Sequence, residues 1–299
     1  QGPATVGPCS CAVAHLQGVG MPPMRFIEEQ GAYQDGKTIL GRRLEPRILS
    51  LTLVLRSAGG ISLDQDDENL ETARRLLATW FNPYNAGVRP GRWRWEAHGV
   101  SREIKAEFRG RLDFDDLPVD GNEIKPAVDL YCQDPLFYDP SLQSHTFALT
   151  ALSQLVFPIE FPIVFGGGII SETESITNAG DWDVFPTIIV DGPANDVQIR
   201  NLTTGEVLKL TGAGGYNIAA GERVTFDLAY GAKTINNNRG VNLIGYLSTD
   251  SDLAEFHLAH AKAVDAAGNV MAPGGVNEIN VVASGCTADT AIRIEWYNA

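Results

Sequence analysis

Apolar residues recur at every second position in many short segments of the chain. Residues 49–55 place four leucines on one side of the chain and Ser50, Thr52 and Val54 on the other. Successive side chains of a β-strand point to opposite faces, so this period predicts a half-buried strand. The same period recurs in further segments, at 92–96, 104–108, 197–200, 224–228 and 292–296. Turn-forming clusters lie between many of these segments, and such a series of short strands is typical of β-sandwiches.

One segment follows a helical period instead. Its apolar residues, at positions 70, 73, 76, 77 and 81, share one face of a helix that Asn82-Pro83 would end. Ser62 and Gln65 match a capping box, and the acidic residues at 64 and 66–68 suit the positive end of the helix dipole. This acidic cluster lacks the glycine and the ligand spacing of an EF-hand, so no calcium site is expected. We predict one amphipathic helix over 63–81.

The composition is that of a globular protein with an acidic balance. The chain has 299 residues, of which 44% are hydrophobic and 20% are charged, and its formal net charge is -14. This length allows one large domain or two of ordinary size. Excess negative charge disfavours nucleic acid and anionic membranes, which proteins bind through Lys and Arg. The sequence contains no stretch of about 18 uncharged apolar residues, so no membrane span is expected.

The two halves of the chain differ in composition. Residues 1–165 carry 16 basic and 21 acidic side chains and the predicted helix, whereas 166–299 carry 7 and 16 and only strand patterns. A proline-rich apolar stretch at 157–162 runs into the glycines at 166–168 between them. We therefore predict two domains, 1–165 and 166–299. The first residues lack Met and a basic segment before an apolar run, which favours a trimmed or partial terminus over a signal peptide.

Cysteine and histidine spacing gives little support for a metal site. Cys9-Ser10-Cys11 and His15 lie close together, but a structural zinc site takes four ligands and no second pair is near. His257 and His260 could share one helical face, yet no Glu lies between them and no third ligand is evident. We expect no metal and no cofactor. The cysteines are expected to be free thiols of a reducing compartment, namely Cys9, Cys11, Cys132 and Cys286.

The common signatures of catalysis are absent from the sequence. Neither a nucleophile elbow nor a P-loop occurs, so no catalytic residue is predicted. One basic and aromatic patch, formed by Arg89, Arg92, Trp93, Arg94 and Trp95, could stack on bases or sugars. Alternation places the two tryptophans opposite Arg92 and Arg94, which favours a buried strand with a charged outer face.

A series of local motifs follows one order along most of the chain. In the most specific motif, at 130–138, an apolar strand leads into Asp134-Pro135 and the aromatic pair Phe137-Tyr138. The other motifs are turn and strand segments at 30–36, 41–47, 81–83, 176–180, 191–193, 199–201, 204–205, 227–233 and 274–279. In this order the chain resembles the distal tail proteins of phages with long non-contractile tails, the siphophage tail-component family. Residues 1–22 have no counterpart in the resemblance, and the segment 259–273 is longer than usual.

The resemblance implies a structural virion protein and no enzyme. It implies a ring, usually a hexamer, at the distal end of the phage tail, assembled in the host cytoplasm. The ring would join the tail tube protein to the tip or baseplate hub and its receptor-binding proteins, and would encircle the tape-measure protein and the DNA path. The domain 1–165 would build the ring as a β-sandwich with one helix. The domain 166–299 would be a galectin-like or carbohydrate-module-like sandwich that points outward.

Two other functions stay open, together with one detail of the ring. A binding module could recognise host glycans through exposed aromatic residues such as Trp182, Tyr216 and Tyr246, although core or rim positions are favoured for them. A glycosidase or peptidase of a tail tip would require a facing carboxylate pair in a cleft. An acidic inner wall of the ring would let DNA pass without binding, a hypothesis that a lumen lined with Arg42, Arg43 and Arg47 would contradict.

Overall fold

The computed structural model divides the chain into two compact units, Gln1–Phe137 and Tyr138–Ala299. The structure describes residues 4–6, 9–57, 63–82, 84, 91–97, 99–114, 123–148, 168–211 and 214–299. The expected boundary after residue 165 lies outside these residues. The structure divides the chain earlier because the strand that follows Phe137 pairs with the last strand of the chain.

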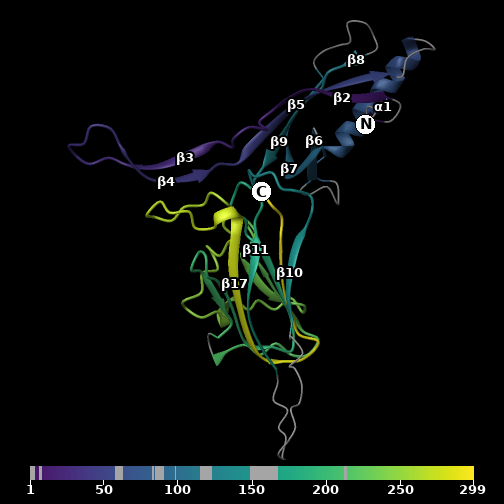
Figure 1. Ribbon diagram of the computed structural model, residues 1–299. Coiled ribbons are helices and arrows are strands. Elements are labelled where there is room, and N and C mark those ends of the chain that lie inside the picture. The colour runs from purple at the N-terminus through teal and green to yellow at the C-terminus, as the bar shows by residue number, and fades with distance from the viewer. Residues whose placement is uncertain are drawn as a thin grey trace, which may run out of the picture. The chain divides into compact units, whose positions relative to one another are not determined.

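The strands of the first unit form one antiparallel sheet and one separate hairpin (Figure 1). The sheet has the order β1-β2-β5-β9-β7-β6, and β8 pairs with β5. Its strands are β1 (Ala4–Val6), β2 (Cys9–Gln17), β5 (Arg47–Ser57), β6 (Gly91–Ala97), β7 (Val100–Asp113), β8 (Glu123–Ile124) and β9 (Ala127–Cys132). The hairpin consists of β3 (Met24–Glu29) and β4 (Thr38–Leu44), which pair only with each other among the described residues.

The predicted helix packs on the predicted leucine strand. The helix α1 spans Leu63–Trp80, close to the expected 63–81. Its residues Leu70, Ala73 and Leu77 are buried in one cluster with the four leucines of β5. The predicted start signals, Ser62 and the side chains at 64–67, lie outside the described part of the structure.

The second unit is a β-sandwich of two antiparallel sheets, as its alternation predicts. One sheet has the order β10-β18-β12-β15-β16 and the other β11-β17-β13-β14. The strands are β10 (Gln143–Ala148), β11 (Gly168–Thr177), β12 (Thr187–Asp191), β13 (Asn195–Asn201), β14 (Val207–Lys209), β15 (Arg223–Asp227), β16 (Thr234–Asn237), β17 (Val276–Cys286) and β18 (Ala291–Trp296), and two short 3-10 helices are η2 (Ile244–Tyr246) and η3 (Pro273–Gly275). Alternate residues of both sheets, among them Ile199, Phe226 and Ile294, share one buried core.

The two faces of β5 give a direct test of this packing. Leu49 is fully buried, whereas its neighbour Ile48 is 40% exposed. We expect Leu49→Ala to lower the free energy of unfolding of the first unit by about 3 kcal/mol, because it removes methyl groups and leaves a cavity. Ile48→Ala is the matched control and should lower the free energy of unfolding by less than about 1 kcal/mol. Urea titration of both variants measures the two losses. Equal losses for the two variants would contradict the assignment of the faces.

Candidate functional site

The hairpin of the first unit, which we call the hairpin arm (residues 24–44), exposes apolar side chains along its whole length. Every residue of β3 is exposed, and Tyr33 at the turn is fully accessible. The other exposed apolar residues of the arm are Met24, Phe26, Ile27, Ile39 and Leu40. A two-stranded hairpin is marginally stable by itself in water. An arm with this much exposed apolar surface is therefore a candidate for contact with another chain.

The base of the hairpin arm is fixed by a buried arginine. Arg47 directly follows the arm, and its Nη1 donates to the carbonyl oxygens of Gly18 and Gly20, both at 3.0 Å. Its guanidinium lies 4.8 Å from the ring centre of Phe137, and burial lowers its pKa. Gly18 has φ +88°, and a Cβ there would lie 2.1 Å from the carbonyl oxygen of Ile48, so only glycine fits. Arg47 thus ties the chain segment before the arm to the strand after it.

The three arginines expected to form one cluster have different roles. Arg47 is buried at the base of the arm, whereas Arg42 and Arg43 lie on the arm itself. Arg43 is paired directly across the hairpin with Arg25, and Arg42 with Phe26. Like charges placed opposite each other destabilise a strand pair, so a carboxylate from outside the arm would stabilise it.

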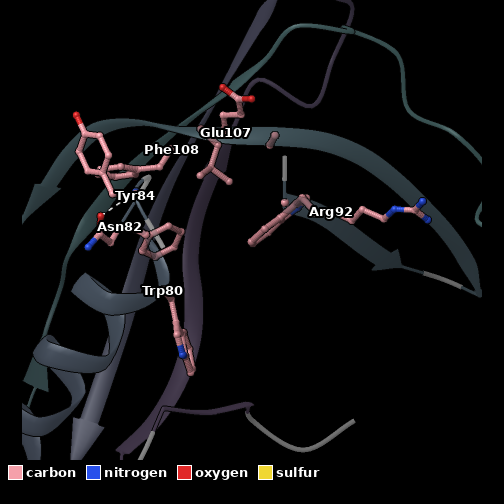
Figure 2. A pocket seen from close by; sticks show the side chains of 11 residues that line it. Trp80, Asn82, Tyr84, Arg92, Glu107 and Phe108 are labelled. Carbon is pink, nitrogen blue, oxygen red and sulfur yellow. Dashed lines mark hydrogen bonds between the residues drawn. The ribbon is translucent and has the colours of Figure 1, made fainter. Parts of the chain in front are cut away.

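An aromatic pocket of about 500 Å³ lies where α1 ends beside β6 and β7 (Figure 2). The ring centres of Phe81 and Phe108 are 5.6 Å apart, and Tyr84 also lines the pocket. The backbone N–H of Tyr84 donates to Oδ1 of Asn82 at 3.0 Å. Trp80 and Glu107 also line the pocket. A largely apolar concavity of this size can hold a ligand or the side chains of a partner.

The expected basic and aromatic patch is divided between two faces of β6. Trp93 packs against the core, while Arg92 and Arg94 are exposed and both contact Glu103. Trp95 is 41% exposed, so the prediction of a buried tryptophan pair is wrong for this residue. Its place near the end of β6, opposite Arg102, leaves it at the margin of the core. Arg89 lies outside the described residues.

In the second unit, one asparagine from each of the sequence motifs at 176–180, 199–201 and 274–279 is fully buried, and all three form hydrogen bonds with the same loop. Asn178 Nδ2 donates to the carbonyl oxygens of Trp182 and Leu258, at 2.8 and 3.0 Å. Asn201 Nδ2 donates to the carbonyl oxygen of His257 at 2.8 Å. Asn277 donates to the carbonyl oxygen of Ala259 and accepts from the N–H of the same residue. Together the three amides fix the backbone of 257–259.

This loop brings the two predicted histidines to two carboxylates. His257 Nδ1 lies 2.8 Å from Glu206 Oε1, and His257 Nε2 lies 4.0 Å from Asp183 Oδ2. His260 Nδ1 lies 2.7 Å from Asp183 Oδ1. The pair does not share a helical face, because the segment is an extended loop. No group of three or more His, Cys, Asp or Glu residues within the described ranges could hold a metal ion.

The three aromatic residues considered for glycan binding do not form one site. Tyr216 and Tyr246 do come together, with ring centres 5.0 Å apart. Tyr216 donates to Glu222 Oε1 at 2.6 Å, and this hydrogen bond raises the pKa of the tyrosine. Trp182 lies instead beside the last residue of the chain, where its backbone N–H donates to the carbonyl oxygen of Ala299 at 3.3 Å.

The cysteines carry no site. None of the four forms a disulfide, as expected, and Cys9, Cys132 and Cys286 are buried. Burial raises the pKa of Cys132 to about 11, which keeps it in the unreactive thiol form. In the part of the chain that the structure describes, no helix has the length and apolar character needed to cross a bilayer.

Taken together, the described residues form two β units, one α-helix and one exposed hairpin arm. The chain is similar in structure to the Dit protein of phage SPP1, described as a paradigm of the hub adsorption apparatus in phages that infect Gram-positive bacteria. The TM-score is 0.55 at 15% identity, over 95% of this chain and 92% of that chain. This confirms the expected resemblance to a siphophage distal tail protein at the level of the fold.

Two structures of the phage p2 baseplate in its activated conformation, with strontium and with calcium, are weaker matches. Each is 8% identical, with TM-scores of 0.42 and 0.41. The first match covers 95% of this chain and the second 97%, and both cover 90% of the matched chain. No family model and no curated protein sequence matches the chain.

The buried amide of Asn277 gives a test of the loop anchor. Its four hydrogen bonds, to Ala259, Gly275 and Asn201, are all made in the interior. We expect Asn277→Ala to destabilise the second unit by about 3 kcal/mol or more, because it leaves buried backbone groups without partners. Asn280→Ala, on the same strand and partly exposed, should cost less than about 1 kcal/mol in urea unfolding. A loss below 1 kcal/mol for Asn277→Ala would contradict the anchoring role.

His257 predicts a pH dependence of stability. Burial of its ring opposes the charged form, but the hydrogen bond and charge of Glu206 outweigh burial and raise the pKa above 6.5. This stabilisation is fully present below about pH 6.5 and is lost as the pH rises through the folded-state pKa. The free energy of unfolding, measured in urea, should therefore fall as the pH rises above 6.5. We expect this fall to be smaller in His257→Gln and in Glu206→Gln. A slope unchanged in both variants would show that other groups cause it.

Proposed function

We propose that this chain is a structural virion protein that forms a ring, a hexamer by family resemblance, at the distal end of a phage tail. The ring would join the tail tube protein to the tip or baseplate hub and its receptor-binding proteins, and would surround the tape-measure protein. The observation that carries the proposal is the exposed apolar hairpin arm on a fixed base. The fold likeness to the SPP1 tail hub protein supports it.

A hairpin arm on every copy leads to a head-to-tail assembly. The arm of one copy packs on a different surface of the next, which is a heterologous contact, and such contacts generate a ring when the rotation between copies closes. The arm is the donor surface because its apolar residues lie on both strands, for example Phe26 on β3 and Ile39 on β4. Burying them would supply the association energy.

The aromatic pocket at the end of α1 is the receiving surface that we propose. It offers rings at Trp80 and Tyr84, which are exposed, to the apolar side chains of the arm. Glu107 lines the same pocket and is opposite in charge to Arg25 and Arg43 of the arm. Apolar contact flanked by complementary charge is the usual composition of a specific interface.

The oligomeric state of the full chain tests this proposal. By light scattering we expect the mass of a hexamer of 32.3 kDa subunits, with a central hole in negative-stain images. The double variant Phe26→Ser and Ile39→Ser should run as a 32.3 kDa monomer, because it removes apolar surface that only the ring would bury.

The matched control places the same change on the second unit. Val264 and Val270 are also exposed, and Val264→Ser with Val270→Ser should leave the ring intact. Because all four residues are exposed in the single subunit, both double variants should still fold with a cooperative urea transition, so loss of the ring would not reflect misfolding. A ring that survives the arm variant would contradict the role of the arm. A parent that is monomeric at all concentrations would contradict the self-assembling ring.

A further inference from the structure

Two hydrogen-bond acceptors face each other in the second unit, and we call these two atoms the acceptor pair. They are Nε2 of His257 and Oδ2 of Asp183, and the distance of 4.0 Å between them is too long for a direct hydrogen bond. Within the described ranges, neither atom has a hydrogen-bond partner. The side chain of Asp183 is 42% exposed, so a ligand can reach the pair from solvent.

The other polar atoms of these two side chains are already paired. His257 Nδ1 lies 2.8 Å from Oε1 of Glu206 and 2.8 Å from the carbonyl oxygen of Glu255, and both of these atoms are acceptors. Nδ1 therefore carries the proton of the neutral ring, and Nε2 keeps a lone pair. On the other side, Asp183 Oδ1 accepts from the backbone N–H of His260 at 3.1 Å and lies 2.7 Å from Nδ1 of the same residue. Only Nε2 and Oδ2 are left to receive a ligand.

A ligand that satisfies the acceptor pair must carry two hydrogens on one atom. A hydroxyl group has a single hydrogen and can serve only one of the two acceptors. An ammonium nitrogen has three hydrogens, and at about 2.8 Å from each acceptor it can donate to both. Water also carries two hydrogens, so the charge around the pair decides whether an ammonium group displaces it.

The charge around the acceptor pair favours a cation. Three carboxylates act here, those of Asp183, Glu206 and Asp227. They are opposed by the ammonium group of Lys233, which does not serve the acceptor pair. Its Nζ atom is buried 3.7 Å from the ring centre of Phe185 and has no hydrogen-bond partner within the described structure. An ammonium group from outside would therefore meet net negative charge, and hydrogen bonds between charged groups are the stronger ones.

Tyr230 offers an apolar surface for the alkyl stem that carries such an ammonium group. It is 57% exposed and meets Phe185 edge to face, with ring centres 4.9 Å apart. The ring centre of Phe185 lies 6.2 Å from that of His257, so the three rings form a series that ends at the acceptor pair. The four-carbon stem of a lysine can lie along apolar surface while its ammonium group is bound by polar atoms.

We infer that Asp183, His257 and Tyr230 form a binding site for a primary alkylammonium group, such as a lysine side chain of a protein or a free amine carries. The ammonium nitrogen donates to both atoms of the acceptor pair, and the alkyl stem lies on Tyr230. All three residues belong to the second unit, whereas the contacts of the proposed ring lie in the first, so the site goes beyond the proposed function.

Binding at this site strengthens as the pH rises. Protonation of His257 replaces the lone pair of Nε2 by an N–H group, which removes one acceptor and repels the ligand. Burial opposes the charged ring, but Glu206 outweighs burial and raises the pKa of His257 above 6.5, so at pH 5.5 about a tenth of the ring or less is neutral. Burial lowers the pKa of Lys233 to about 8, and loss of its proton also favours the ligand. Protonation of His260 or of any of the three carboxylates would weaken binding, so all of these groups act in one direction.

Saturation-transfer difference NMR of the full chain tests the inference. The probes are n-butylammonium and Nα-acetyl-lysine N-methylamide, and Nα-acetyl-norleucine N-methylamide carries the same stem without the ammonium group. Physiological salt limits unspecific attraction to a chain of net charge -14. We expect both amines to bind at pH 8 and the norleucine derivative not to bind. At pH 5.5 the affinity for both amines should fall about fivefold or more, because the neutral ring is scarce.

The two amines distinguish the sources of the ammonium group. Tighter binding of the lysine derivative than of n-butylammonium would assign the site to a lysine side chain of a protein. Tighter binding of n-butylammonium would assign it to a free amine. Either result supports the site itself.

Two variants test the residues that form the site. Asp183→Asn removes the charge but keeps an oxygen that can accept from His260, and it should weaken both amines about tenfold. Tyr230→Ala removes the surface for the stem and should weaken them about threefold. Asp289→Asn is the matched control, because it removes the same charge from an exposed residue elsewhere in the second unit, and it should bind as the parent does.

Four results would overturn the inference: no saturation transfer from either amine, equal binding of the norleucine derivative, binding that is unchanged in Asp183→Asn or equally weakened in Asp289→Asn, or tighter binding at pH 5.5 than at pH 8. Light scattering of the same samples reports on the ring separately. Failure of one proposal is therefore distinguishable from failure of the other.

Discussion

Three buried asparagine amides hold the loop end of the second sandwich together. A buried amide is costly unless its donors and acceptor are all paired, and here backbone groups of distant segments supply most of the partners. Asn277 and Asn178 both meet η3, where Gly275 has φ +75° and a Cβ would lie 2.0 Å from the carbonyl oxygen of Asn178. The positions of His257 and His260 beside Glu206 and Asp183 follow from this network.

The elements of the fold that depend on local patterns could be predicted from the sequence. Alternating leucines specify β5, and the stripe of Leu70, Ala73 and Leu77 specifies α1, because periodicity fixes which face is buried. The place of β10 in the second compact unit could not be predicted in this way. It depends on the pairing of β10 with β18, a contact between residues about 150 positions apart that leaves no periodic signal in either strand.

The candidate sites were predictable only in part, for the same reason. Arg47 cannot be told from Arg42 in the sequence, yet one is buried and the other is exposed on the hairpin arm. The spacing of His257 and His260 would have placed both on one face of a helix, but the segment is a loop, in which His260 Nδ1 lies 2.7 Å and His257 Nε2 lies 4.0 Å from Asp183.

Because its base is fixed, the hairpin arm loses conformational entropy when the subunit folds and not when subunits associate. The N–H of Glu45 donates to the carbonyl oxygen of Pro23 at 2.8 Å and joins the two ends of the arm, while Arg47 of β5 holds Gly18 and Gly20 in the segment before it. The direction of the arm is then decided while a single subunit folds. A partner that meets it binds a preorganised surface and loses less freedom on association than it would with a hinged arm.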